Sequence, residues 1–362
     1  MPDESLSQSR DQFVERLLNS ARGVFDIFSV YLGTQLGYYR ALADGDALTS
    51  VELAARTNTN ERYTREWLEQ QTVTGILRVQ DETLPARERR YLLPRGLIEP
   101  LLDQDSGNYL APVTQLIVGA TRPMEELLNA FRTGGGVPYR AYGANLREGQ
   151  AAINRPAFLT DLPNVWIPAM PDVHERLQTH GAHIADFGCG LGWSSIGMAR
   201  AYPNARVDGF DLDAPSIERA REIANEYGVS ERAQFHVKDA GDAELLGQYA
   251  LVTAFECVHD MSNPVDALQT MKRLAGERGA VLIVDERVGD RFTAEGNDVE
   301  WMMYGWSVLH CLPVGMAEQP SAETGTVMRA DTLREYARQA GFRRVEMLPI
   351  ENFFFQFYRL YA

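Results

Sequence analysis

The segment IADFGCGLGWSS at residues 184–195 has the residue types and spacing to hold a nucleotide. Its glycines Gly188, Gly190 and Gly192 alternate, and a glycine-rich turn between a strand and a helix lets backbone N–H groups approach a ligand closely. The third glycine stands one residue too early for G-x-G-x-x-G, the pattern that seats a pyrophosphate at a helix N-terminus. Asp186 precedes the turn, and its carboxylate would repel a pyrophosphate but attract a cationic amino group.

Further acidic residues indicate the rest of the ligand. Asp211 ends the second predicted strand, at a spacing from the turn where its carboxylate can accept both ribose hydroxyls. Asp239 and Ala240 follow the third strand, where an acid can meet an adenine amino group. A ligand with ribose, adenine and an ammonium-bearing tail but no phosphate is S-adenosylmethionine (SAM). We also assign Leu212 and Glu256 to its binding site.

The elements that must position these residues form an α/β domain. From residue 183, apolar strands alternate with amphipathic helices, which is the pattern of a parallel sheet. The predicted parallel strands lie at residues 183–187, 205–213, 233–239, 249–260 and 279–288. Residues 342–348 and 352–362 are expected to form a closing β-hairpin.

The first half of the chain is expected to be mostly helical. Apolar residues recur at helical spacing through residues 13–43. Two amphipathic helices follow at 48–58 and 60–75, and residues 76–94 contain two short β runs around a polar turn. Two helices followed by a two-stranded wing form a winged helix. We therefore expect two domains, residues 1–165 and 166–362.

Charge argues against nucleic acid as the partner of the winged helix. The chain has 35 basic and 50 acidic residues, a net charge of −15. The candidate recognition helix at 60–75 is itself not basic, because it carries three glutamates against two arginines. We find no apolar run of about 18 residues and no leader-like start, so we expect no membrane partner and a cytoplasmic location.

The motifs D-x-G-x-G-x-G, the acid after the second strand and Asp239-Ala240 resemble class I SAM-dependent methyltransferases. The resemblance covers about residues 165–362 and implies a seven-stranded Rossmann-like domain. A preceding winged-helix domain is similar to that of the small-molecule O-methyltransferases of plants and actinobacteria. That likeness implies a small-molecule acceptor and a homodimer formed through the N-terminal domain.

The same resemblance assigns catalytic residues. These O-methyltransferases carry a His-Asp pair after the fourth strand, matched here by His259-Asp260 in FECVHDMSNP. Imidazole near its unperturbed pKa can take a phenol or enol proton, so His259 is the predicted general base and Asp260 its orienting acid. Glu286, at the end of the fifth strand, matches a further acid of the family. A second acid has no clear match, since Met328 stands at about its place.

The acceptor site is predicted from an aromatic helix and a glycine-rich segment. His310 ends an aromatic and methionine stripe in residues 297–313 that includes Trp306. Tyr139 and Tyr142 follow three successive glycines. We expect these four side chains to line the acceptor site, although such stripes and glycine segments are also typical of core and surface loops.

A second chemistry uses the same histidines. His259, Asp260 and His310 form a set that can hold a divalent or ferric ion with open positions. The chain resembles α-keto acid C-methyltransferases in having a His-Asp pair and a later histidine as metal ligands. There the ion would stabilise the enolate, so that carbon is methylated. Two alternatives belong to other classes of protein. A SAM-sensing transcription regulator would need a basic recognition helix, which this chain lacks. A catalytically silent scaffold would lack a base at the pocket, and His259 argues against it.

Overall fold

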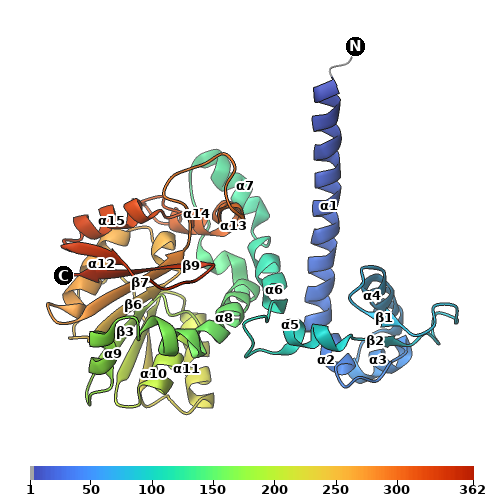
Figure 1. Cartoon of the computed structure of the whole chain (residues 1–362), viewed down its shortest axis with the longest axis horizontal. Coiled ribbons are helices and arrows are strands. Elements are labelled where there is room, and N and C mark those ends of the chain that lie inside the picture. Colours follow the sequence, from blue (N-terminus) through green and yellow to red (C-terminus); the bar gives the residue numbers. More distant parts are fainter. Residues whose placement is uncertain (1–3) are drawn as a thin grey trace. The chain divides into compact units, whose positions relative to one another are not determined.

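The computed structural model describes residues 4–362, which divide into two compact units at residues 118 and 119. The first unit contains the predicted winged helix, and the second contains the α/β domain. The boundary predicted between residues 165 and 166 lies inside the second unit, because helix α8 (Gly143–Leu159) packs on α10 (Trp193–Ala201). The two units are described separately (Figure 1).

The N-terminal unit begins with a long helix, α1 (Glu4–Gln35), drawn in blue in Figure 1. Gly37 has a φ of 72°, which ends the helical path before the next helix. The remaining elements are α2 (Tyr38–Leu42), α3 (Ser50–Thr57), α4 (Glu61–Val73), β1 (Arg78–Val79), β2 (Tyr91–Leu92), η1 (Arg95–Leu97), α5 (Ile98–Leu102) and α6 (Ala111–Ala120). The antiparallel β1 and β2 form the wing.

Local signals explain the helices of this unit. Thr49 caps α3 in a reciprocal capping box with Glu52, as predicted. Trp67 of α4 donates its indole N–H to the carbonyl of Ser29, 2.8 Å away, which fixes the C-terminal half of α1 to the winged helix. Gly33 allows this contact, since a Cβ there would lie 2.3 Å from the Trp67 ring.

The C-terminal unit is built on the predicted seven-stranded sheet. Its strands are β3 (His183–Phe187), β4 (Arg206–Asp211), β5 (Ala233–Val237), β6 (Leu251–Phe255), β7 (Ala280–Glu286), β8 (Arg344–Met347) and β9 (Phe355–Tyr361). The order is β5-β4-β3-β6-β7-β9-β8, and β9 runs antiparallel to both its neighbours. All seven predicted strands, including the closing hairpin, are confirmed.

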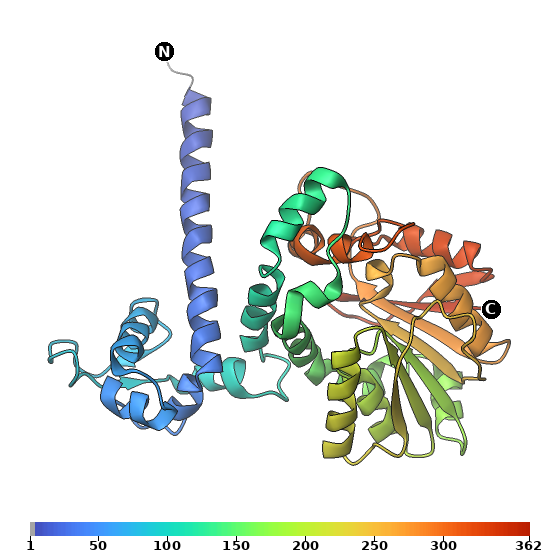
Figure 2. The ribbon, with the colours of Figure 1, turned by 180° about the vertical axis from the view of Figure 1, so that it is seen from behind.

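Helices cover both faces of this sheet (Figures 1 and 2). Successive strand residues point to opposite faces, so Ile184 lies in one apolar core and Ala185 in the other. The core around Ile184 includes η3 (Leu162–Trp166), α9 (Pro171–Leu177), α10 and α11 (Ala214–Glu226). The core around Ala185 includes α12 (Pro264–Ala275) and α15 (Ala330–Gln339).

The other segments of this unit are α7 (Met124–Thr133), η2 (Tyr139–Tyr142), η4 (Val258–Asp260), α13 (Asp298–Trp306), η5 (Ser307–Cys311) and α14 (Leu312–Gly315). The predicted helix at 297–313 is interrupted by η5, a π-helical stretch. Such stretches often mark functional sites. No helix in the described part of the chain is long and apolar enough to cross a membrane.

Candidate active site

The glycine turn between β3 and α10 requires glycine for steric reasons. Gly188, Gly190 and Gly192 have φ values of 64°, 51° and 82°, in the left-handed region that favours glycine. A Cβ on Gly188 would lie 2.7 Å from Sγ of Cys257, and one on Gly192 would lie 2.6 Å from the ring of Phe235. The backbone of the turn is therefore pressed against β5 and the end of β6.

Asp186 holds this turn in place. It is fully buried, and its carboxylate accepts hydrogen bonds from the hydroxyls of Ser194 and Ser195 at 2.6 Å and of Thr253 at 2.8 Å. Burial raises the pKa of Asp186, while the three hydroxyls oppose that rise. The carboxylate thus joins β3, α10 and β6, and its contact with a cofactor amino group stays a prediction.

Asp211 lies at the end of β4 and faces the turn. One carboxylate oxygen accepts the N–H of Gly190 at 2.9 Å, and the other accepts the N–H of Asp213 at 2.8 Å. Each oxygen keeps a second lone pair, so the carboxylate can also accept ribose hydroxyls. Asp213 caps α11 and forms an ion pair with Arg147, at 3.4 Å, from α8.

The residues assigned to adenosine lie at the same sheet edge. Leu212 follows β4 and is 61% exposed. Asp239, also exposed, follows β5, where its carboxylate accepts the N–H of Gly241 at 2.7 Å and Ala240 is half-buried. Because β5, β4, β3 and β6 are consecutive in the sheet, these residues and the glycine turn share one edge. That edge includes the switch point between β3 and β6, where open α/β sheets bind ligands.

A buried cluster of acids surrounds His259, which is 2% exposed and lies in η4 just after β6. Its Nδ1 is 2.8 Å from Oδ1 of Asp285 and 3.3 Å from Oε2 of Glu286. Its Nε2 is 3.3 Å from Oδ1 of Asp260. Burial acts to lower the pKa of His259, but the three carboxylates outweigh burial and hold the pKa well above its usual range.

Asp285 was missed in the sequence analysis. It forms the shortest contact with His259, at 2.8 Å, whereas the predicted Glu286 is its neighbour in the strand. The available signal was VDER, in which two adjacent acids end an apolar strand. Burial raises the pKa of Glu286 well above its usual range, with Asp285 adding to the effect.

Glu256 joins this cluster from the end of β6. Its backbone has a φ of 50°, which is uncommon for a residue other than glycine. The side-chain amide of Asn154, from α8, donates a hydrogen bond to Oε2 of Glu256. Burial raises the pKa of Glu256 to about 7, while His259 opposes the rise and Asp285 adds to it.

Three of the four residues predicted to line the acceptor site lie together. His310 packs edge-on against Tyr142 and Tyr139, with ring centroids 4.7 Å and 5.8 Å away. Tyr142 is fully buried and donates its hydroxyl to the carbonyl of Leu309 at 2.9 Å. Burial lowers the pKa of His310, so its ring is neutral near pH 7. Trp306 ends α13 half-buried, and its role stays a prediction.

The side chains that lie together as possible metal ligands differ from the predicted three. The side-chain donor atoms of His259, Asp260 and Cys311 lie within 4.8 Å of one another, so Cys311 is placed where His310 was expected. Burial raises the pKa of the Cys311 thiol to about 12, which disfavours the thiolate that binds metals. In the described chain, Nε2 of His310 and Oδ1 of Asp260 are buried without hydrogen-bond partners.

Comparison with known families agrees with this geometry. Residues 178–329 match the family model of a methyltransferase domain, and residues 27–97 match that of an Rv2258c-like winged HTH domain. The chain carries a winged-helix domain followed in the sequence by a SAM-dependent methyltransferase domain. The resemblance inferred from the glycine turn and its acids is thereby confirmed.

Solved structures show the same fold over the whole chain. Mitomycin 7-O-methyltransferase MmcR is 16% identical, with a TM-score of 0.69 over 98% of this chain and 99% of that one. Human N-acetylserotonin methyltransferase, solved with SAM, is 18% identical, with a TM-score of 0.64 over 97% of this chain and 98% of that one. At these low sequence identities, the likeness shows a shared fold and nothing about the substrate.

Curated relatives match the methyltransferase domain over shorter stretches. A probable chloroplastic tocopherol O-methyltransferase of rice is 31% identical over 32% of this chain and 31% of its own. A ubiquinone biosynthesis O-methyltransferase of Azoarcus is 28% identical over 46% of this chain and 66% of its own. The chain therefore spans from about a third to just under two thirds of these relatives.

Proposed function

We propose that this protein transfers the methyl group of SAM to a hydroxyl group of a small organic acceptor, with His259 as the general base. The observation that carries the proposal is the buried His259–Asp285 pair, at 2.8 Å, beside the glycine turn at the carboxyl edge of the sheet. The relatives named as O-methyltransferases support the same reaction class.

The geometry assigns each nitrogen of His259 a task. Nδ1 donates its hydrogen to Asp285, which leaves Nε2, beside Asp260, to accept the proton of the acceptor hydroxyl. The acceptor oxygen then forms a bond to the methyl carbon as the carbon–sulfur bond breaks, and S-adenosylhomocysteine leaves. The displacement itself needs mainly alignment of oxygen, carbon and sulfur, so positioning and deprotonation are the protein's contributions.

Methyl transfer is expected with small phenols and without added metal. The purified protein would be incubated with methyl-labelled SAM and a panel of phenols in the presence of EDTA, and labelled product would be separated and counted. Labelled methyl ether from at least one phenol is the expected result, because His259 needs no metal to take the proton. Transfer confined to α-keto acids, and abolished by EDTA, would contradict O-methylation.

The second candidate is metal-assisted C-methylation of an α-keto acid. It is favoured by Asp260 Oδ1 and His310 Nε2, which are buried and make no hydrogen bond among the described residues. It is also favoured by the carboxylate on Nδ1 of His259, an arrangement that orients metal-binding histidines elsewhere. The predicted ligands are His259, Asp260 and His310, whereas the donor atoms that lie together are those of His259, Asp260 and Cys311. This candidate therefore needs His310 or Cys311 as the third ligand. The bound ion would supply Lewis acidity towards the keto acid.

Metal content distinguishes the two candidates. C-methylation predicts near-stoichiometric metal in the native protein, measured by mass spectrometry after washing with EDTA, and loss of most of it in His310→Ala. The matched control is His236→Ala, since His236 pairs with Asp208, at 3.0 Å, outside the cluster. Metal-free protein that still methylates phenols would contradict this candidate.

The proposed homodimer is supported by the surface of α1. Apolar positions recur along this helix in alternating steps of four and three residues, the repeat that lets two helices pack as a coiled coil. They are Val14, Leu18, Ala21, Phe25, Phe28 and Leu32. All six are exposed, Phe25 to 67%, and they lie in one continuous row along a single helix. We propose a second copy of this helix as the occupant.

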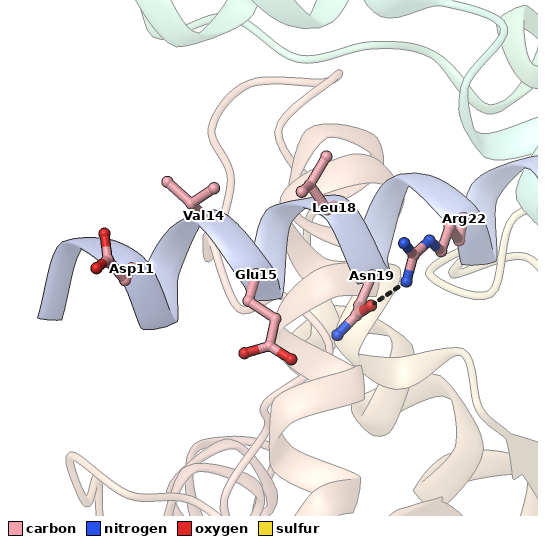
Figure 3. Close-up of a pocket in the computed structure, with 6 residues that line it drawn as sticks. All are labelled: Asp11, Val14, Glu15, Leu18, Asn19 and Arg22. Atoms are coloured by element: carbon pink, nitrogen blue, oxygen red, sulfur yellow. Dashed lines mark hydrogen bonds between the residues drawn. The ribbon is translucent and has the colours of Figure 1, made fainter. Parts of the chain in front are cut away.

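Charge gives the direction of the pairing. Glu15 and Arg22 are one heptad apart and so flank the seam on the same side. Figure 3 shows them beside Val14 and Leu18, with Arg22 donating to the Asn19 side chain at 3.0 Å. An antiparallel pair centred between Leu18 and Ala21 would place each Glu15 beside Arg22 of the second copy. The antiparallel arrangement is therefore the one we propose.

A further inference from the structure

The strand order arranges the parts of SAM along the carboxyl edge. Asp239 follows β5, Asp211 ends β4 and the glycine turn follows β3, while β6 is the next strand. Adenine at Asp239 and ribose at Asp211 direct the methionine part across the turn towards β6. The reacting sulfur therefore comes to the end of β6, where Glu256 is the first residue after the strand.

Glu256 is held beside the glycine turn. Phe187 of β3 pairs with Ala254 of β6, so the residues after both strands are neighbours. Cys257, the residue after Glu256, closely approaches Gly188, which agrees with this neighbourhood. Asn154 fixes the Glu256 carboxylate from the side, and the Glu256 N–H donates to the carbonyl of Val284 at 2.8 Å.

The surroundings of Glu256 contain more acid than base. His259 acts on it as a cation, whereas Asp285 and Asp260 act on it as negative charges. Glu286 is 5% exposed, and its Oε2 lies 3.3 Å from Nδ1 of His259 without a hydrogen bond among the described residues. A single histidine faces several buried acids, and a further cation that enters the site reduces the cost of their negative charge.

We propose that Glu256 recognises the positive charge on the sulfonium sulfur of SAM, so that the site binds SAM more tightly than S-adenosylhomocysteine. This inference rests on the proposed methyl transfer, since it concerns the same cofactor site. Transfer converts the sulfonium to a neutral thioether, which removes the attraction to Glu256. S-adenosylhomocysteine would therefore dissociate more readily than SAM from the same site.

The test compares ligands that differ in charge at one atom. Dissociation constants for SAM and S-adenosylhomocysteine would be measured by calorimetry on the full-length wild type and on Glu256→Gln. Glutamine keeps the shape of the side chain and can still accept from Asn154. The matched control is Glu323→Gln, because Glu323 also has a positive φ, of 52°, but is exposed.

The wild type and Glu323→Gln are expected to bind SAM more tightly than S-adenosylhomocysteine. In Glu256→Gln the ratio of the two affinities should fall about five- to tenfold, with little change for S-adenosylhomocysteine. Sinefungin, which has a protonated amine at the sulfonium position, should also bind the wild type more tightly than S-adenosylhomocysteine does. That measurement needs no variant.

Other outcomes overturn the inference. Equal weakening of SAM and S-adenosylhomocysteine in Glu256→Gln would mean that Glu256 contacts the α-ammonium group, which both ligands share. An unchanged affinity ratio in a folded variant, or sinefungin binding the wild type no better than S-adenosylhomocysteine, would contradict charge recognition. A wild type that binds none of the three would instead contradict the proposed methyl transfer, and this inference with it.

Discussion

Replacing His259 with alanine is expected to lower kcat about 10²- to 10⁴-fold and to leave the affinity for SAM nearly unchanged. The imidazole takes the acceptor proton in this proposal, while the cofactor is held by the glycine turn and by Asp211 across the sheet edge. Turnover would be measured with a methylated phenol as product, and SAM affinity by calorimetry. Equal losses of turnover and affinity would show that His259 organises the pocket and is not the base.

The pH profile gives a second readout of the same residue. A general base must be neutral, and the carboxylates of Asp285, Glu286 and Asp260 hold the pKa of His259 well above its usual range, against the effect of burial. The neutral fraction, and with it kcat, should rise about tenfold per pH unit below that pKa, and activity should be greatest in alkaline buffer. This slope should disappear in His259→Ala and persist in the control His236→Ala.

Replacing Phe25 with glutamate is expected to convert a dimer into a monomer. Phe25 is 67% exposed in the single chain, and in the proposed coiled coil it packs against Val14 of the second copy. Burying an unpaired carboxylate in that seam would weaken association at least about 10³-fold. Light scattering after size-exclusion chromatography would give the mass, and Ser20→Glu on the far side of α1 is the control.

Charge reversal tests the antiparallel register. Glu15→Arg and Arg22→Glu should each weaken the dimer, because each places like charges side by side, and the double variant should restore it. A wild-type monomer would contradict the proposed homodimer. Phe25→Glu remaining dimeric would show that the interface lies elsewhere on the chain.

Much of the arrangement at the carboxyl edge of the sheet was predictable because its signals are local. The three glycines alternate within five residues, and each has the positive φ that a strand-to-helix turn needs. Asp211 and Asp239 each stand where a predicted strand ends. Since parallel strands place their carboxyl ends on one sheet edge, strand boundaries alone bring these residues together. The same reasoning located His259 and Glu256 after β6.

Side-chain direction was not predictable. Sequence spacing gave no sign that the Asp186 carboxylate accepts three hydroxyls, one of them on Thr253 from a distant part of the chain. His310 was the expected third ligand, yet Cys311 lies with His259 and Asp260. Both residues are in the π-helical stretch η5, where α-helical spacing no longer gives the direction of a side chain.

The sequence by itself determined the two-part architecture, the seven strands of the sheet and the His259-Asp260 pair, because each depends on patterns within one element or on adjacent residues. Only the tertiary structure decided that Asp285 is the acid on Nδ1 of His259 and that Asp285 and Asp260 act on Glu256 as negative charges. These contacts join residues of β6, η4, β7 and α8. Their distances follow from how the sheet twists and packs, which no local pattern in the chain encodes.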